Sequence, residues 1–328
     1  MARVLIAYSH QRIYRDADGN PMLDRNILSA VLDVQRCLKE KRHKVAKAVL
    51  RRNPSGFLKA VARFRPDVIF NLCEEVDGDT NKEKAAAAFF ELLDIPFTGN
   101  DALALALCLN KPLTKRILET ARIPTPDFTT AEVSSKTSLP FAFPAIVKPM
   151  REDGSLGITS HSVVHNRQQL ARRIGYIRRN FCQPALVEKF IPGREFQVAL
   201  LGNPPPRVLA VAELSYEGLP PSLPKIVSYA AKWHKGSSYY RHTNPILPAP
   251  IDARLRRRLC GIAVDIAGIF ALRGYARVDF RADGSRPYVI DVNPNPDISE
   301  DAGLARAARW AGLSYPDLVD RLVRLALE

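Results

Sequence analysis

The sequence predicts an α/β fold that begins with a parallel sheet. Three stretches at 4–8, 45–50 and 67–72 have the length and aliphatic content of buried strands. Helical patterns at 28–39, 57–64 and 82–93 separate or follow these strands. Strands that alternate with helices form parallel sheets covered by those helices. The glycines of this region do not form the GxGxxG pattern, so a dinucleotide fingerprint is absent.

The remaining sequence predicts a more mixed α+β arrangement. A helix at 112–120 ends before Pro124 and Pro126, which mark a boundary because proline ends helices. A second unit has predicted strands at 145–148, 158–164 and 185–190 around a helix at 167–179. A third has strands at 195–201, 207–213, 274–280 and 286–293, a long helix at 252–272, and closing helices near 303–311 and 316–327. We expect domains at 1–110, 111–187 and 188–328.

Composition excludes several classes of protein. The 328 residues are 46% hydrophobic and 25% charged, which is ordinary for a globular chain and argues against disorder. The net charge is +14, but no nucleic-acid-binding motif accompanies the dispersed basic residues, so no nucleic-acid partner is expected. The longest obvious apolar run, at 102–109, is far shorter than the ~20 residues that cross a bilayer. With no signal-peptide pattern at the start, we expect a cytoplasmic protein.

The five cysteines indicate no special chemistry. They are scattered, with no CxxC pair and no Cys/His spacing typical of zinc. We interpret them as mostly buried thiols.

The most informative feature is a predicted β-hairpin over 274–293 with an Asp-Gly turn. Side chains alternate along a strand, so Arg277 and Asp279 share one face, as do Asp291 and Asn293 on the next strand. Two carboxylates and an amide oxygen suit a hard cation such as Mg²⁺. The hairpin is therefore either a metal site beside an anion-binding arginine or a salt-bridged surface hairpin.

Two further segments carry candidate binding residues. Lys148 ends a strand directly before a loop with Gly154, Ser155 and Gly157, whose backbone N–H groups can approach phosphate oxygens. The alternative is an ordinary turn with an exposed lysine. Farther on, carboxylates at Glu188 and Glu195 surround a tight turn and could accept from ribose hydroxyls, or be plain surface charges.

In order and spacing, these pieces resemble the ATP-grasp superfamily, most closely its D-alanine–D-alanine ligase branch. The resemblance runs through roughly residues 66–300, whereas the P-loop, kinase, HExxH and GxSxG motifs are absent. Its landmarks are 95–99, 110–115, 123–126, 147–149, the loop at 154–157, Glu188-Lys189-x-Ile191 with Glu195, Arg277-x-Asp279 and Asp291-x-Asn293-x-x-Pro296. The resemblance implies an ATP-grasp fold behind a Rossmann-like amino-terminal sheet, and an ADP-forming carboxylate–amine ligase.

The resemblance also implies a role for each landmark. Lys111 and Lys148 would hold ATP phosphates, under a lid made by Gly154, Ser155 and Gly157. Glu188, Lys189 and Ile191 would line the adenine pocket, with Glu195 on the ribose. Asp279, Asp291 and Asn293 would bind two Mg²⁺ ions. Lys232 would approach the transferred phosphate, and Arg277 would stabilise phosphoryl transfer and the tetrahedral intermediate.

Departures from the family concern the substrates. The amino-terminal Gly-Gly-x-Ser-x-Glu motif is replaced by the residues at 8–12, and Trp233 replaces a tyrosine after Lys232. A glycine of the oxyanion region is Asp297, and a serine for the second substrate's carboxylate is Ala302. Glu300 and Asp301 would add negative charge there, so we expect the acceptor site to favour an amine-rich substrate.

These departures predict that D-alanyl-D-alanine synthesis is not the activity. We expect small carboxylate and amine substrates and, from the resemblance, a homodimer. Two alternatives stay open: a ligase that modifies a protein or carrier terminus, which the charge of +14 would suit if the partner is acidic, and an inactive ATP-binding regulator.

Overall fold

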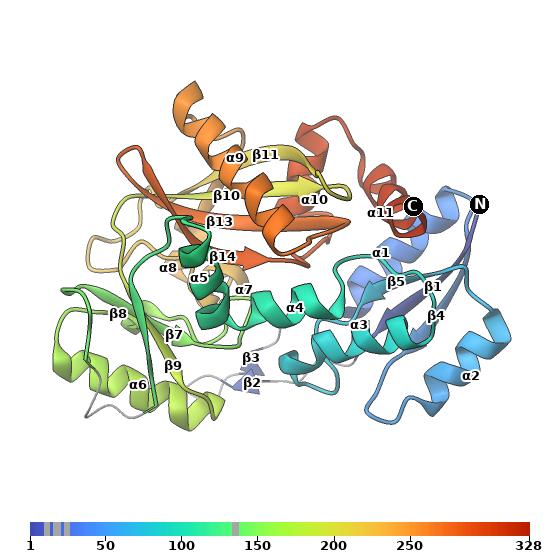
Figure 1. The fold of residues 1–328 in the computed structure, drawn as a ribbon, viewed down its shortest axis with the longest axis horizontal. Helices are drawn as coiled ribbons and strands as arrows, with labels where there is room; N and C mark the ends of the chain where they lie inside the picture. Colours follow the sequence, from blue (N-terminus) through green and yellow to red (C-terminus); the bar gives the residue numbers. More distant parts are fainter. Residues whose placement is uncertain (10–13, 16–20, 23–26, 133–137) are drawn as a thin grey trace.

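The computed structural model describes residues 1–9, 14–15, 21–22, 27–132 and 138–328. The chain starts with the predicted parallel sheet, in the order β4-β1-β5 (Figure 1). Its strands are β1 (Arg3–Tyr8), β4 (Lys44–Val49) and β5 (Val68–Leu72). Every residue of β5 is buried, which agrees with a sequence in which only Asn71 is polar. A short hairpin, β2 (Tyr14–Arg15) with β3 (Pro21–Met22), lies outside this sheet.

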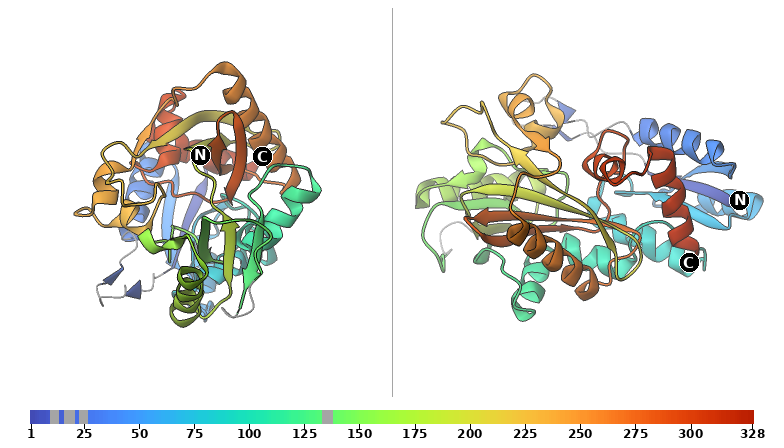
Figure 2. Two further views of the ribbon diagram at one scale, coloured as in Figure 1. Left: turned by 90° about the vertical axis from the view of Figure 1, so that its left-hand side faces the viewer. Right: turned by 90° about the horizontal axis from the view of Figure 1, so that it is seen from above.

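Helices cover both faces of the first sheet. One face packs against α2 (Ser55–Phe64) and α3 (Glu83–Leu92). The other packs against α1 (Ile27–Glu40) and against α11 (Tyr315–Leu327), from the far end of the chain. Figures 1 and 2 show the two termini on the same unit. The hydrophobic stripe of α11 therefore closes the core of the amino-terminal unit.

The second sheet has the order β6-β9-β7-β8 and is antiparallel. It comprises β6 (Phe128–Ala131), β7 (Ala145–Pro149), β8 (Val163–Val164) and β9 (Ala185–Lys189), with α6 (Arg167–Phe181) against one face. Two differences from the sequence prediction occur here. β6 was not expected, and the strand expected over 158–164 is reduced to two residues. Thr159 caps a 3₁₀ helix over Ser160–Ser162, and these capping bonds replace strand pairing.

The third sheet is antiparallel and carries the predicted hairpin, in the order β12-β11-β10-β13-β14. Its strands are β10 (Arg194–Leu201), β11 (Arg207–Ser215), β12 (Asn244–Ile246), β13 (Tyr275–Asp283) and β14 (Arg286–Asn293). Its back face packs against α4 (Ala102–Leu109), α5 (Lys111–Thr120) and α9 (Ala253–Ile269). The connection from β11 to β12 contains α7 (Tyr229–Trp233) and α8 (Ser238–His242), and α10 (Gly303–Trp310) packs on β10 and β11.

The sheets do not follow the expected domain limits in every respect. The limit between 187 and 188 falls inside β9, so the second sheet continues to Lys189. α4 belongs in sequence to the first expected domain but packs on the third sheet, and α11 belongs to the third but packs on the first. Among the described helices, none is long and apolar enough to cross a membrane.

Asn100 joins the amino-terminal unit to the third sheet. It is fully buried, and its amide Nδ2 donates to the carbonyls of Tyr275 and Pro294. Its backbone N–H donates to Asn295 Oδ1 at 3.0 Å. Beside it, Gly99 has a φ of +88°, and an added Cβ would lie 2.6 Å from Asn295 Oδ1. This close approach explains why the segment before α4 contains a glycine.

Glu83 lies next to this junction and makes stability depend on pH. Asn295 Nδ2 donates to Glu83 Oε1 at 3.0 Å. Burial, reinforced by Asp153, raises the pKa of Glu83 from 4.5 to about 8. The folded protein therefore keeps a proton on Glu83 at pH values where the unfolded chain has released it, so folding stability falls as pH rises through this window.

We expect Glu83→Gln to reduce this pH dependence. A neutral amide keeps the contact with Asn295 but has no proton to lose. Urea denaturation below, within and above the window from pH 4.5 to about 8 measures the effect. The native protein should lose up to ~1.4 kcal/mol of stability per pH unit that the variant does not lose. Parallel pH profiles for the two proteins would contradict this assignment.

Candidate active site

The β13–β14 hairpin places its polar residues on the front face of the third sheet. Arg277 is paired in register with Asn293, and Asp279 with Asp291, as the alternation predicted. A β-bulge follows, because Phe280 pairs with Val289 and leaves Ile290 as an extra residue. Both Ile290 and Asp291 consequently line the pocket. The alternation of side chains could not predict this bulge.

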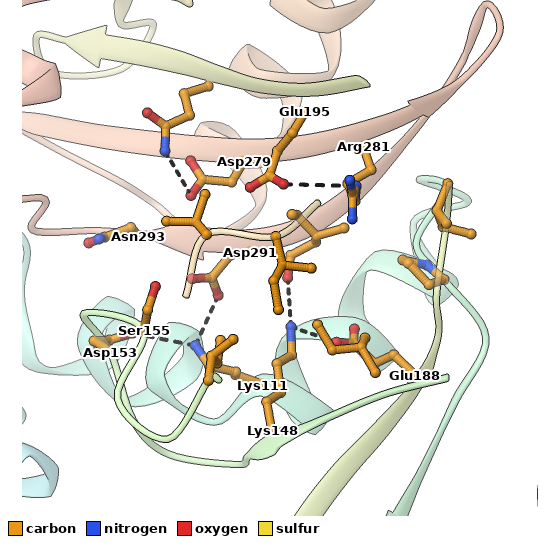
Figure 3. Close-up of a pocket in the computed structure, with 18 of the residues that line it drawn as sticks. Lys111, Lys148, Asp153, Ser155, Glu188, Glu195, Asp279, Arg281, Asp291 and Asn293 are labelled. Carbon is orange, nitrogen blue, oxygen red and sulfur yellow. Dashed lines mark hydrogen bonds and ion pairs between the residues drawn. The ribbon is translucent and has the colours of Figure 1, made fainter. Parts of the chain in front are cut away.

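Two basic residues meet these carboxylates: Lys111 of α5, which Figure 3 shows beside Asp291, and Arg277 of the hairpin itself. Lys111, the first residue of α5, contacts Asp291 at 3.0 Å and Asp153 at 3.4 Å. Burial alone would lower the pKa of Lys111, but the two carboxylates raise it above its ordinary value. Arg277 Nε donates to Asp279 Oδ1 at 2.6 Å and Nη2 to Oδ2 at 2.9 Å. Asp279 and Asp291 are thus each neutralised by a cation.

Glu188 lies between two buried lysines. Its carboxylate contacts Lys148 at 2.5 Å and Lys115 at 2.7 Å, and its side chain is 2% exposed. Burial would raise the pKa of Glu188, but Lys115 and Lys148 lower it below its ordinary value. Lys148 Nζ also donates to the Ile290 carbonyl at 3.3 Å, so the lysine before the loop does reach the acidic hairpin. The carboxylate of Glu188 is therefore engaged with these two lysines.

Lys115 was not among the predicted site residues. It is 4% exposed and also donates to Thr125 Oγ1. It follows Lys111 by four residues on α5, a spacing that places both side chains on one helix face. That spacing was the available signal, but lysines at i and i+4 are common on exposed helices.

Three residues in the loop after β7 have left-handed backbone conformations. Gly154, Ser155 and Gly157 have φ values of +62°, +64° and +74°. Leu156 packs against Tyr229 and Trp233 of α7, and Trp233 Nε1 donates to the Gly154 carbonyl at 3.4 Å. Trp233 therefore holds the loop and is not among the residues that line the pocket.

The far end of the pocket contains the predicted ribose residue. Glu195 is 5% exposed and accepts a hydrogen bond from Tyr216 Oη at 2.7 Å. Burial raises the pKa of Glu195, and the nearby Arg281, at 3.8 Å, opposes this. Arg281 was not predicted, although it continues the alternation through positions 277 and 279. Its guanidinium lies over the Phe190 ring, 4.7 Å from the centroid.

These groups surround one cavity of about 110 Å³ between the second and third sheets. Nearly all the predicted binding and metal residues line it: Lys111, Lys148, Gly154, Ser155, Glu188, Lys189, Ile191, Glu195, Lys232, Arg277, Asp279, Asp291 and Asn293. Gly157 is outside the lining, and Glu152, Asp153, Gln197 and Arg281 are additions that sequence reasoning missed. The structure therefore brings together residues spread over 111–293.

Lys232 differs from the ion-paired cations of the cavity, which are Lys111, Lys148, Arg277 and Arg281. Within the described part of the chain, no carboxylate lies within 4.0 Å of its ammonium group. Burial and the neighbouring Arg277 lower the pKa of Lys232. An ammonium group held here without a partner would be stabilised by an anionic ligand.

The residues predicted on the acceptor side are placed differently. Asp297 accepts hydrogen bonds from the backbone and hydroxyl of Ser299. Glu300 is half exposed and contacts Arg36 and Arg309 at 3.4 and 4.0 Å. Neither these two nor Asp301 lines the cavity, so the structure does not bring the predicted negative charge to it. The altered amino-terminal motif continues into 10–13, outside the described residues.

The hairpin has oxygen donors suited to a divalent cation. Asp279 and Asp291 are register partners, and Asn293 follows on the same side of the cavity. No group of three or more His, Cys, Asp or Glu side chains gathers in the described residues, so a cation here would need the Asn293 amide oxygen. Two carboxylates with an amide oxygen fit Mg²⁺ rather than a softer metal.

Comparison with known proteins identifies the family. The model of the D-ala D-ala ligase C-terminus matches residues 117–324. A D-alanine–D-alanine ligase of Moorella thermoacetica is 31% identical over 324 residues, which cover 94% of this chain and 97% of that protein. The chain belongs to the D-alanine–D-alanine ligase family. A second relative of this chain is an uncharacterized protein of Sinorhizobium fredii, y4sG, with 32% identity. The alignment covers 83% of this chain and 80% of that protein.

A solved structure of a D-alanine–D-alanine ligase supports the fold. The crystal structure of the Bacillus anthracis enzyme complexed with ATP matches 100% of this chain and 98% of its own, with a TM-score of 0.76. The sequence identity is 18%, so this match concerns the fold alone. The expectation of an ATP-grasp fold is confirmed. Membership of the D-alanine–D-alanine ligase family makes this chain an ATP-dependent, ADP-forming ligase.

Proposed function

We propose that the protein joins a carboxylate to an amine through an acyl phosphate, with ATP as the phosphate donor and substrates other than two D-alanines. The observation that carries this proposal is the single cavity in which Lys111 and Lys148 meet the Asp279–Asp291 hairpin. ATP is named in the structure of the Bacillus anthracis ligase, and the cavity here is lined by lysine and arginine side chains that can contact phosphate oxygens.

Each cation has a distinct part in this chemistry. Lys111 and Lys148 would hold the phosphates, and Lys232 with Arg277 would stabilise the phosphoryl group as it moves to the substrate carboxylate. Asp279, Asp291 and Asn293 would hold Mg²⁺, whose charge neutralises phosphate oxygens when it is bound. The carboxyl oxygen attacks the terminal phosphorus, ADP leaves, and an amine then displaces phosphate from the acyl carbon.

The loop over the cavity protects this intermediate. Water would hydrolyse an acyl phosphate, so the reaction requires a covered site. The loop at Gly154–Gly157 is held down by Leu156 on Tyr229 and by the Trp233 hydrogen bond. Since Trp233 contacts the loop, its role is to hold this cover in place.

Sequence departures support a substrate other than D-alanine. The resemblance to the family implies a glycine and a serine beside the acceptor. In this chain, Asp297 and Ala302 stand at these positions. ADP release measured with amino acids in pairs, in both stereochemical forms, identifies the substrates. We expect a mixed pair to exceed D-alanine alone. An equal or higher rate with D-alanine alone would overturn this assignment, and no ADP release from any pair would overturn the ligase proposal.

We expect Gly157→Ala to impair ATP use more than Gly154→Ala. Both positions have positive φ, so both variants carry a backbone cost of about 1 kcal/mol. An added Cβ at Gly157 would lie 2.7 Å from Pro149 and 2.9 Å from Phe181, whereas none at Gly154 meets an atom within 4 Å. The KM for ATP, measured by ADP release, should rise several-fold more in the Gly157 variant. Equal KM values would show that packing beneath the loop is unimportant.

A further inference from the structure

A second cavity adjoins the first along the front face of the third sheet. Its volume is about 40 Å³, enough for a few heavy atoms, and Gln197 and Arg277 line both cavities. It lies against β10, β11 and β12, under α10. A substrate bound at Arg277 could therefore extend into it.

Small side chains create this cavity. Ala199, Ala210 and Ala212 line it from the sheet, and Gly303 and Ala307 from α10. An added Cβ at Gly303 would meet only Gln197 Oε1, at the ordinary distance of 3.7 Å. The backbone of Gly303 therefore permits a side chain, and its absence leaves the space open.

The charge of the cavity has one sign. Its charged lining residues are Arg277 and Arg306, with no carboxylate among them. Arg277 is engaged with Asp279, whereas no carboxylate of the described chain lies within 4.0 Å of the Arg306 guanidinium. Arg306 is an exposed residue whose guanidinium is only partly covered; this partial burial and the neighbouring Arg309 lower its pKa, and Asp297 only partly opposes them. An anion bound beside Arg306 would stabilise the charged form of its guanidinium.

We propose that this cavity binds the side chain of an acidic amino acid, such as aspartate or glutamate, which serves as the amine acceptor. The alanine walls accommodate its short methylene stem, and Arg306 pairs with its terminal carboxylate. This inference rests on the proposed ligase function and names the class of one substrate. It replaces the expectation of an amine-rich acceptor, because Asp297, Glu300 and Asp301 do not line the cavity and Arg306 does.

Binding to the full-length protein tests the inference without requiring turnover. Isothermal titration with magnesium and adenylyl imidodiphosphate compares aspartate and glutamate with asparagine and glutamine, in both stereochemical forms. We expect an acid to bind at least about tenfold more tightly than its amide. Arg306→Met should abolish this preference, and Gly303→Val, which fills the cavity, should weaken the acid and its amide alike. Arg309→Met, on the same helix but outside the cavity, should change neither.

Several results would overturn the inference. These are equal affinity for acid and amide, no binding of either, or a preference that survives Arg306→Met. A separate measurement of ADP release tests the ligase proposal independently of the acidic acceptor. Turnover with neutral amino acids alone would leave the ligase function standing and remove the acidic acceptor. Arg306-dependent binding without ADP release from any pair would retain the acidic site and remove the ligase.

Discussion

Replacing Lys232 with methionine is expected to lower the rate of ADP formation by about 10²- to 10³-fold, the range typical when a group that stabilises transition-state charge is removed. The ammonium of Lys232 lines the cavity beside Arg277, with no carboxylate within ion-pair distance in the described chain. Its full charge is therefore available to the moving phosphoryl group. Methionine keeps the length of the apolar stem and removes the ammonium group with its charge.

The pH profile gives this prediction a second readout. Burial and Arg277 lower the pKa of Lys232, so the free enzyme should lose its productive ammonium form at a lower pH than an ordinary lysine would. kcat/KM should fall on the alkaline side in the native enzyme, and this limb should be missing in the variant. Lys235→Met, three residues farther along the chain in an exposed position, is the matched control and should leave the rate unchanged. A Lys232 variant with the native rate would remove this residue from the mechanism.

Glu188→Gln is expected to cause the largest loss of stability. Glu188 is the shared partner of two lysines that are themselves 9% or less exposed. Removing one member of a buried charge group leaves uncompensated charge and costs about 3–5 kcal/mol. Urea denaturation, followed by a probe of the second sheet, should show an earlier transition in the variant.

A compensating variant distinguishes this charge effect from simple loss of packing. Adding Lys115→Met to Glu188→Gln removes one of the two unpaired ammonium groups and should restore part of the stability. The dependence of folding stability on pH should also change at acidic pH. The pKa of Glu188 is lowered in the folded state, so its contribution is present above the pKa of the unfolded chain and disappears as pH falls through the folded value. The native protein alone should show this acid-dependent loss, and a double variant no more stable than Glu188→Gln would contradict the charge explanation.

Local patterns predicted much of the fold and site. The parallel order of the first sheet and the shared face of Arg277, Asp279, Asp291 and Asn293 depend on strand periodicity, which is visible in a short window of sequence. These two features require no knowledge of packing between distant segments. That Lys148 and the hairpin serve one site was expected only from the resemblance to the ATP-grasp superfamily.

The features that were not predicted depend on packing between segments that are distant in the sequence. The bulge at Ile290 is set by pairing with β13, and the partnership of Lys115 with Glu188 requires α5 and β9 to meet. Glu300 was placed at the acceptor on its position in the sequence, but Arg36 of α1 and Arg309 of α10 hold it at the surface. Charge alone does not tell which way a loop residue points.

The position of α11 has a consequence for synthesis of the protein. Residues of β1 and β5 share one core with Leu318, Leu322 and other residues of α11. On the ribosome, the amino-terminal sheet and α1 emerge long before this helix is made, so part of one sheet face stays uncovered until then. Exposed apolar surface of this kind promotes aggregation of nascent chains. Chaperone demand should therefore persist until translation of the last helix is complete.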